Sequence, residues 1–181
     1  NLDVWDLIKL SNRHPRVDIL QPGPGVGGHC IAVDPWFIID IAPEEANLIR
    51  TARLVNDQKP AFVLKKIISK ATFLEKDISE LNITCLGLTF KPDVDDLRES
   101  PALEITKNIC ALDFKKVFLV EPNIRKIPKE LSLFNCELKT LSEGILKADL
   151  VVLLVDHKEF KVMDFSLLSG KEIIDTRGVI R

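Results

Sequence analysis

The sequence predicts an α/β protein in which a helical segment precedes a Rossmann-like, doubly wound parallel sheet. The length of 181 residues suits one ordinary domain with an appendage. Up to about residue 80 the pattern is helical around one Gly/Pro-rich loop, and after it short apolar runs alternate with helical patterns. Strands that alternate with helices form a parallel sheet covered on both faces. We therefore expect two domains, 1–80 and 81–181.

The first segment opens with apolar residues at helical spacing. The members of this stripe are Leu2, Val4, Trp5, Leu7, Ile8 and Leu10. Pro15 ends the stripe, and residues 17–20 are compatible with a short strand. The Gly/Pro-rich loop follows at 21–30.

Two further helices are expected before the sheet. Asp34 has the character of a helix N-cap, with Pro35 at the first helical position. Pro43, followed by two glutamates, predicts the start of a longer helix, because acidic side chains are favourable in a first turn. A break or kink is expected at Pro60, where the backbone lacks a donor.

The second segment predicts four strands and two helices. The expected strands cover 83–90, 116–120, 149–155 and 172–175, and the expected helices cover 101–112 and 141–147. Ser100 is the expected N-cap of the first of these helices. The run from Val151 to Val155 is wholly apolar, as in a strand buried on both faces.

Composition narrows the classes of function. The net charge is -2 with both signs interspersed, which argues against a nucleic-acid or membrane-surface partner. No apolar run reaches the roughly 18 residues of a membrane span. The four cysteines are far apart and form no Cys-x-x-Cys pair, so we expect free thiols, no bound metal and a cytoplasmic protein. The chain begins at Asn1, inside a helical pattern, so we expect it to be part of a longer protein.

Three cations follow two of the predicted strands: Lys91 and Arg98 lie in the loop after 83–90, and Arg177 follows 172–175. In doubly wound sheets, ligands bind outside the carboxyl ends of the strands. Lys91, Arg98 and Arg177 are therefore expected at one edge, where they would suit an anion such as a pyrophosphate. The alternative is that they pair with nearby carboxylates. Those carboxylates are Asp93, Asp95, Asp96, Glu99 and Glu121.

The glycine loop formally matches the dinucleotide fingerprint G-x-G-x-x-G at 23–28. That fingerprint requires a strand before it and a helix directly after it, whereas the next helix here is expected only near Pro35. We interpret the glycines instead as a loop that holds backbone close to a ligand. A loop that merely turns tightly is the other interpretation.

Cys30 ends the loop, four residues before the expected helix start at Asp34. A thiol near a helix N-terminus has a stabilised thiolate, which is the reactive form. The alternative is a small buried apolar residue, a role that suits Cys85 and Cys110 better. Asp34 would cap the helix or serve as a general base. His29 is a weaker candidate base, because adjacent side chains in an extended segment point to opposite sides.

Three motifs together resemble the UDP-glucose/UDP-N-acetylmannosamine dehydrogenase family. The segment GGHCIAVD (27–34) resembles the family's Gly-Gly-x-Cys-x-x-x-Asp motif, and LGLTFKPD (86–93) with DLRESP (96–101) resembles its second signature. DTRG (175–178) matches a third. The strings RHPR (13–16) and QPGPGVGGHCIAVDPWF (21–37) are similar to the branch that acts on N-acetylated sugars.

The resemblance implies an NAD-dependent UDP-sugar 6-dehydrogenase. Residues 1–80 would be part of its central helical dimerisation domain and would carry the cysteine loop, and 81–181 would bind the UDP half of the substrate. The family's NAD-binding domain and an upstream catalytic Lys and Asn are outside this chain, so the chain alone is not expected to turn over. The implied partners are the UDP-sugar and a second subunit, bound through the central helices.

The chemistry implied is oxidation of the sugar C6 alcohol to a carboxylate through a thioester on the cysteine, with two NAD. The first choice of substrate is UDP-N-acetyl-D-mannosamine, in cell-surface polysaccharide biosynthesis, and UDP-N-acetylglucosamine is the second. A non-catalytic UDP-binding module and a cysteine hydrolase using His157 are the alternatives. The residues implied are Cys30 and Asp34 in catalysis, His14, Arg16, Gly27, Phe90, Lys91 and Arg177 at the substrate, and Arg98 at the NAD phosphates.

Overall fold

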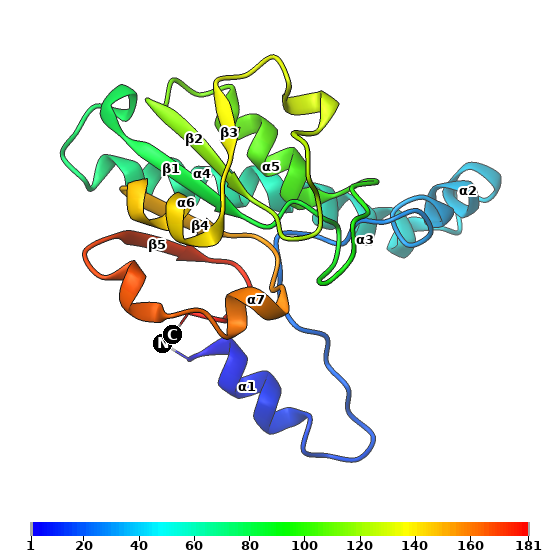
Figure 1. Cartoon of the computed structure of the whole chain (residues 1–181). Helices are drawn as coiled ribbons and strands as arrows, with labels where there is room; N and C mark the ends of the chain where they lie inside the picture. Colours follow the sequence, from blue (N-terminus) through cyan, green and yellow to red (C-terminus); the bar gives the residue numbers. More distant parts are fainter. Residues whose placement is uncertain (1, 181) are drawn as a thin grey trace.

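The computed structural model describes residues 2–180, which are built around one five-stranded parallel sheet (Figure 1). The spatial order of the strands is β3-β2-β1-β4-β5. Their bounds are β1 Asn82–Leu86, β2 Lys116–Val120, β3 Cys136–Leu138, β4 Leu150–Leu153 and β5 Glu172–Asp175. Every pairing is parallel, and Leu86 of β1 lies between Val120 and Leu153 of its neighbours. The predicted fold class is confirmed.

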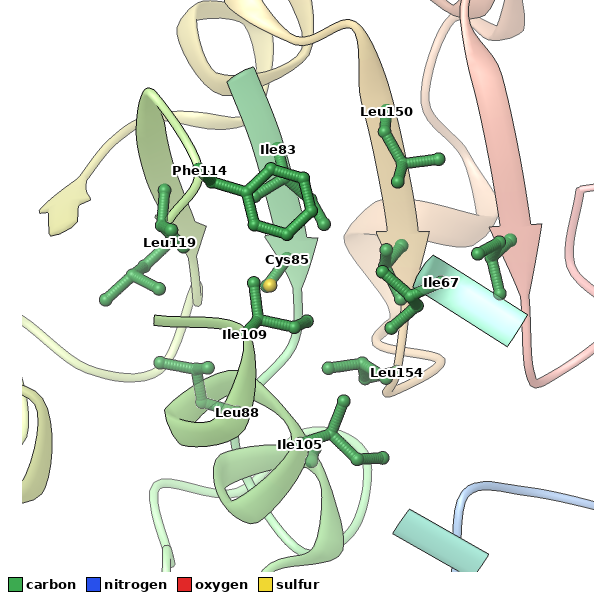
Figure 2. Packing of buried hydrophobic residues seen from close by; sticks show 14 of the residues in the cluster. Ile67, Ile83, Cys85, Leu88, Ile105, Ile109, Phe114, Leu119, Leu150 and Leu154 are labelled. Carbon is green, nitrogen blue, oxygen red and sulfur yellow. The ribbon is translucent and has the colours of Figure 1, made fainter. Parts of the chain in front are cut away.

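Helices cover both faces of the sheet. One face carries α4 (Lys59–Thr72) and α5 (Pro101–Cys110), and the other carries α6 (Leu141–Lys147) and α7 (Lys158–Lys161). Successive strand residues alternate between the two cores: the side chain of Cys85 packs with α4 and α5, and that of Leu86 packs on the α6 side. Figure 2 shows the first core, where Ile67 and Ile109 pack over the strands.

Three more helices precede the sheet. They are α1 (Val4–Ser11), α2 (Asp34–Ile41) and α3 (Asn47–Asp57). In Figure 1, α1 lies beyond the β5 edge, whereas α2 and α3 pack on each other on the other side of the molecule. The expected break near Pro60 is confirmed, because α3 ends at Asp57 and Pro60 lies in the first turn of α4.

Two predicted helix starts are wrong. Asp34 is the first residue of α2 and does not cap it; Val33 occupies the cap position without a side-chain hydrogen bond. The helix expected from Pro43 begins only at Asn47, after a turn closed by the Ala46 N–H on the Ala42 carbonyl. Each proline lies at a change of chain direction. Pro35 lies within the first turn of α2, and Pro43 lies before the first turn of α3.

The strand predictions differ from the structure at four places. The strand expected at 83–90 ends at Leu86, before Gly87 with its φ of +92°, and the strand expected at 149–155 ends at Leu153. Residues 17–20 form no strand, because the side chain of Asn12 bonds both the N–H and the carbonyl of Ile19 (2.7 and 2.9 Å). The edge strand β3 was missed, since its three residues give too short an apolar signal.

Helix α4 belongs to the core of the sheet, although it precedes residue 80. Val63, Ile67 and Ala71 are all buried in the same core as β1 and β4. The position of the domain boundary therefore stays a prediction. Among residues 2–180, no helix combines the length and apolar character needed to cross a membrane.

Candidate functional site

A cavity of about 260 Å³ lies where the cysteine loop, residues 21–33, meets the carboxyl ends of β1, β4 and β5. Gly27, Phe90, Lys91 and Arg177 line this cavity, which we call the strand-end cavity. Ile31, the neighbour of Cys30, lines it too. The structure thus brings together four of the residues implied for the substrate, and places the cysteine loop over them.

The glycines of the loop allow close approach to the protein itself. A Cβ at Gly27 would lie 2.0 Å from the Glu99 carbonyl oxygen, and one at Gly28 would lie 2.9 Å from the Phe90 ring. The Gly28 N–H also donates to the Arg98 carbonyl (3.2 Å), with Gly28 at a φ of +93°. Neither tight turning nor approach to a ligand is needed to explain these two glycines, because packing against the sheet domain requires them.

Helix α3 holds the loop from its other side. The Asn56 side chain accepts from the Val26 N–H (2.7 Å) and donates to the Val26 carbonyl (3.2 Å). Arg53, which is only 8% exposed, donates through Nη1 to the Ile31 carbonyl (3.4 Å). Its Nη2 pairs with Asp57 at 2.7 Å. This α3 clamp, made by Arg53, Asn56 and Asp57, fixes the backbone before and after Cys30.

Cys30 is exposed at the turn that opens α2. Its carbonyl accepts from the N–H groups of Val33 (2.9 Å) and Asp34 (2.8 Å). Asp34 is also exposed, so both predicted catalytic side chains face solvent on the same turn.

The other three cysteines differ from Cys30 in their surroundings. Burial raises the pKa of the Cys85 thiol to about 12 and also raises the pKa values of Cys110 and Cys136. Thiols that resist ionisation react slowly. Among the described residues, Cys30 is therefore the cysteine placed for chemistry.

His14 and Arg16 lie away from this site within one chain. Both are exposed in the loop after α1, where the Arg16 N–H donates to His14 Nδ1 (3.3 Å). Neither lines the strand-end cavity. Within one chain, the structure does not bring them to Cys30.

The three predicted cations divide between two cavities. Arg98 lines a neighbouring cavity of about 720 Å³, together with Arg53. Its Nε and Nη2 bond Asp96 (3.0 and 2.6 Å), and these hydrogen bonds lower the pKa of Asp96 to about 2. Arg177 and Lys91 line the strand-end cavity instead.

Arg177 and Lys91 differ in their pairing. Arg177 Nε bonds Asp156 at 2.8 Å. Among residues 2–180, no carboxylate pairs with the Lys91 ammonium, which lies 5.4 Å from the centre of the Phe90 ring. Of the carboxylates expected to pair with these cations, Asp96 does so, with Arg98; Arg177 pairs instead with Asp156, and Lys91 is left for another anion.

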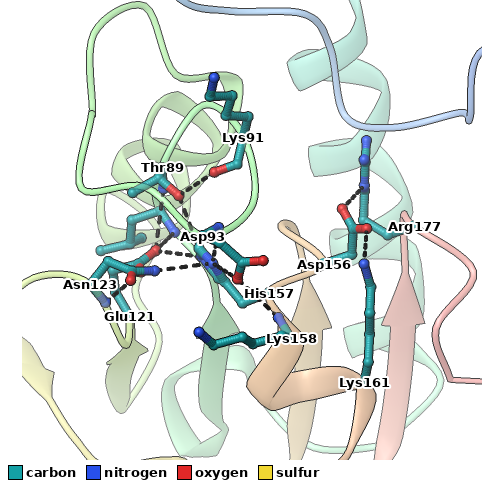
Figure 3. A network of polar contacts seen from close by, with 11 residues as sticks. Thr89, Lys91, Asp93, Glu121, Asn123, Asp156, His157, Lys158, Lys161 and Arg177 are labelled. Atoms are coloured by element: carbon teal, nitrogen blue, oxygen red, sulfur yellow. Dashed lines mark hydrogen bonds and ion pairs between the residues drawn. The ribbon is translucent and has the colours of Figure 1, made fainter.

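A buried polar network below Lys91 was missed in the sequence (Figure 3). Glu121 and His157 follow β2 and β4, and their side chains bond each other at 3.0 Å. The available signal was that Glu121 directly follows one predicted strand and that His157 lies two residues beyond another, the strand expected at 149–155. Because His157 is fully buried and bonds groups other than Cys30, the base required by a cysteine hydrolase is not in place.

Comparison with known proteins agrees with this arrangement. In Escherichia coli, the UDP-N-acetyl-D-mannosamine dehydrogenase is 50% identical over 99% of this chain and 44% of its own length. The NDP-N-acetyl-D-galactosaminuronic acid dehydrogenase of Ralstonia solanacearum is 52% identical over 98% of this chain and 41% of its own. The UDP-D-ManNAc dehydrogenase structure from Pyrococcus horikoshii superposes with a TM-score of 0.85 at 35% identity, covering 99% of this chain and 41% of that one.

The chain thus spans less than half the length of the curated relatives it matches. Residues 84–181 match the UDP binding domain of the UDP-glucose/GDP-mannose dehydrogenase family, and residues 1–58 match its central domain. These matches agree with the resemblance that the three motifs predicted. The chain belongs to the UDP-glucose/GDP-mannose dehydrogenase family.

Proposed function

We propose that this chain supplies the catalytic thiol and the UDP-sugar site of an NAD-dependent UDP-N-acetyl-D-mannosamine 6-dehydrogenase. The observation that carries the proposal is the placement of Cys30, the accessible thiol, on a loop packed against the cavity of Lys91 and Arg177. The product would be UDP-N-acetyl-D-mannosaminuronate, a precursor of cell-surface polysaccharide. The Escherichia coli relative, which bears this substrate in its name, supports the choice.

The strand-end cavity provides the UDP site. A pyrophosphate is negatively charged, so an ammonium and a guanidinium can bind it together. Lys91 and Arg177 supply these two groups, and both line this cavity. Arg177 is oriented by Asp156 through Nε, so within residues 2–180 its terminal nitrogens are left for a ligand. Phe90 and the backbone of Gly27 form the wall of the cavity at the cysteine loop. The sugar would lie against this wall.

Cys30 performs the covalent step. In the first oxidation C6 loses a hydride and its hydroxyl loses a proton, which gives the aldehyde. The Cys30 thiolate attacks this aldehyde, the new S–C bond gives a thiohemiacetal once the oxygen gains a proton, and loss of the second hydride from C6, with that proton, leaves a thioester. NAD, when bound, supplies the hydride acceptor for both oxidations. Asp34, exposed on the same turn, orients or activates the water that attacks the thioester carbonyl; the C–S bond then breaks and the thiolate leaves.

Arg98 is suited to the cofactor phosphates. Its hydrogen bonds to Asp96 use Nε and Nη2, so in the described part of the chain Nη1 is left for a further anion. The guanidinium is exposed and lies over the cavity next to the cysteine loop. An oriented guanidinium fits a phosphate oxygen, which is the role proposed for Arg98.

The helices before the sheet would form the dimer. Large apolar side chains on α1, α2 and α3 are exposed, a feature typical of surfaces that a partner covers. They include Leu7, Leu10, Phe37, Ile41 and Leu48. In such a homodimer, His14 and Arg16 would reach the sugar site of the partner, and residues 1–80 would act as the dimerisation part in the cytoplasm.

The test joins this chain to the upstream part of the Escherichia coli relative and measures NADH formation. UDP-N-acetyl-D-mannosamine is the substrate expected to react best, and Cys30→Ser is expected to abolish turnover while leaving UDP binding intact. UDP-N-acetylglucosamine, UDP-N-acetylgalactosamine and UDP-glucose complete the panel. UDP-N-acetylgalactosamine is included because the Ralstonia solanacearum relative, named for galactosaminuronic acid, is as similar to this chain as the Escherichia coli relative is.

Two results would overturn the proposal. A chimera that folds and binds UDP but forms no NADH with any sugar excludes the dehydrogenase function. Oxidation of UDP-glucose alone excludes the N-acetylated substrates. The unfused chain, which lacks the hydride acceptor site, is expected to bind UDP without turnover.

A further inference from the structure

Three strand ends contribute side chains to one buried network. Thr89 follows β1, Glu121 follows β2 and His157 follows β4 (Figure 3). Thr89 and His157 are 0% exposed, and Glu121 is 4% exposed. Polar groups at this depth are costly unless they are hydrogen-bonded, so their partners show what the network supports.

The hydrogen bonds of the His157 ring define its state. Nδ1 accepts from the backbone N–H of Asp93 at 2.9 Å, because an amide N–H can only donate. Nε2 must therefore carry the proton, and it lies 3.0 Å from the Glu121 carboxylate and 3.3 Å from Thr89 Oγ1. His157 is thus a bridge between a carboxylate on one side and a backbone amide on the other.

Glu121 connects His157 to the end of the sheet through hydrogen bonds. Its carboxylate accepts from the N–H groups of Leu88 (2.8 Å) and Asn123 (3.0 Å) as well as from His157. An acid after the second strand of a dinucleotide-binding fold binds the ribose. Here the same position is occupied by an inward-facing carboxylate whose side chain is 0% exposed, so it serves the protein and leaves ribose to other groups.

The other end of the network reaches the turn that carries Lys91. Thr89 Oγ1 donates to the Lys91 carbonyl at 2.9 Å, and His157 accepts from Asp93 on the far side of Lys91. Asp93 has a φ of +61°, a conformation that costs free energy for a residue with a side chain and needs support from its surroundings. The backbone N–H of Lys158, the residue after His157, donates to the Asp93 carboxylate (3.0 Å).

We propose that His157 is a positioning residue that holds Lys91 toward the pyrophosphate through Thr89 and Asp93. This inference rests on the proposed function, in which Lys91 binds the phosphates of the UDP-sugar. The hydrogen bonds on both sides of Lys91 fix its backbone, and Lys91 lines the strand-end cavity without a carboxylate partner among the described residues. His157 itself is buried and touches no ligand.

The experiment is a double-mutant cycle on UDP affinity, measured by calorimetry on this chain. Lys91→Ala and His157→Ala are each expected to weaken UDP binding about tenfold, the equivalent of one charge-assisted hydrogen bond. If His157 acts through Lys91, the double variant binds no worse than Lys91→Ala alone, because the same contact is lost once. His157→Gln keeps one donor and one acceptor and is expected to restore most of the affinity.

A matched control is Thr106→Ala, which removes another fully buried side-chain hydrogen bond, to Ala102, away from the strand ends. It is expected to lower stability without changing UDP affinity. If His157→Ala does not fold, His157→Asn takes its place in the cycle with Lys91→Ala, and His157→Gln stays the conservative variant that restores affinity.

The outcomes separate the two proposals. Absence of UDP binding by the parent chain, or binding indifferent to Lys91→Ala, overturns the proposed phosphate contact and this inference with it. Binding that depends on Lys91 but not on His157 overturns the inference alone, and so do additive effects in the cycle.

Discussion

Cys30 differs from the other three cysteines in access to solvent, which governs the chemistry of a thiol. Iodoacetamide is expected to modify Cys30 alone in the folded chain, because burial raises the pKa values of Cys85, Cys110 and Cys136. Mass spectrometry should detect a single adduct in buffer and four in denaturant. Cys30→Ser is the control and should stay unmodified while folded. Modification of Cys110 as fast as Cys30 would contradict this assignment.

Glu121 should make stability depend on pH. Burial raises its pKa, but the hydrogen bonds from His157, Leu88 and Asn123 outweigh burial, so its pKa lies below the usual value. A carboxyl whose pKa is lowered by folding stabilises the protein above its unfolded pKa, and that contribution is lost as pH falls through the folded pKa. Glu121→Gln should therefore destabilise the chain by about 1–3 kcal/mol at neutral pH.

The pH series gives the decisive measurement for Glu121. The difference in unfolding free energy between parent and Glu121→Gln should shrink as the pH falls below the usual pKa of glutamate, toward the lower pKa of folded Glu121, where the parent carboxyl gains its proton. Urea unfolding at neutral and acidic pH measures it. A difference that is the same at all pH values would show that ionisation of Glu121 plays no part.

At the scale of elements, the cysteine loop depends on α3 for its conformation. Asn56→Ala removes both hydrogen bonds to Val26, and we expect a loss of about 1–2 kcal/mol with faster amide hydrogen exchange in residues 26–31. Asn47→Ala is the matched control, because the Asn47 side chain lies on the same helix and donates to the Glu44 carbonyl (2.7 Å) instead of to the loop. Equal exchange in the loop of both variants would exclude the α3 clamp as the support of Cys30.

Short sequence patterns predicted those helices and strands whose ends depend on neighbouring residues alone. Ser100 accepts from the Leu103 N–H, so the predicted cap of α5 is confirmed, and the strand at 116–120 has the predicted bounds. Asp34 failed as a cap because the Cys30 carbonyl accepts the Asp34 N–H and draws this residue into the first turn. That contact depends on the path of the whole loop, which residue spacing does not determine.

The candidate site was predictable only in part for the same reason. Lys91 and Arg177 follow strands, so the parallel topology placed them at one edge. The bond between Glu121 and His157, 36 residues apart, requires β1 to lie between β2 and β4. Strand order is a property of the folded sheet, and no local pattern in the sequence encodes it.

At the scale of the molecule, the site exists only where two parts of the chain meet. The cysteine loop comes from the helical segment, whereas Lys91, Arg98 and Arg177 come from the sheet domain. The contacts of Gly27 with Glu99 and of Gly28 with Phe90 join the two. Reactivity of Cys30 and affinity for UDP are therefore expected to be sensitive to substitutions on either side of this junction.

The residue at which the sheet domain begins can be determined by truncation from the N-terminal side. Val63 and Ile67 of α4 are 5% and 0% exposed in the core of the sheet. Burying each such side chain contributes about 1.5–3 kcal/mol, so removing α4 forfeits an appreciable share of the roughly 5–15 kcal/mol that holds a domain together. It would also uncover one face of the sheet beside α5.

A chain of residues 58–181 should therefore fold, with cooperative urea unfolding, whereas a chain of residues 81–181 should not. Circular dichroism and the steepness of the urea transition distinguish the two, and the 58–181 chain carrying Ile67→Asp is the control for loss of α4 packing at constant length. Val63, Ile67 and Ala71 would then define the start of the folding unit near residue 58, where the match to the central domain ends. Cooperative unfolding of 81–181 at the same urea midpoint would instead show that the sheet is stable without α4, and would support a boundary at residue 80.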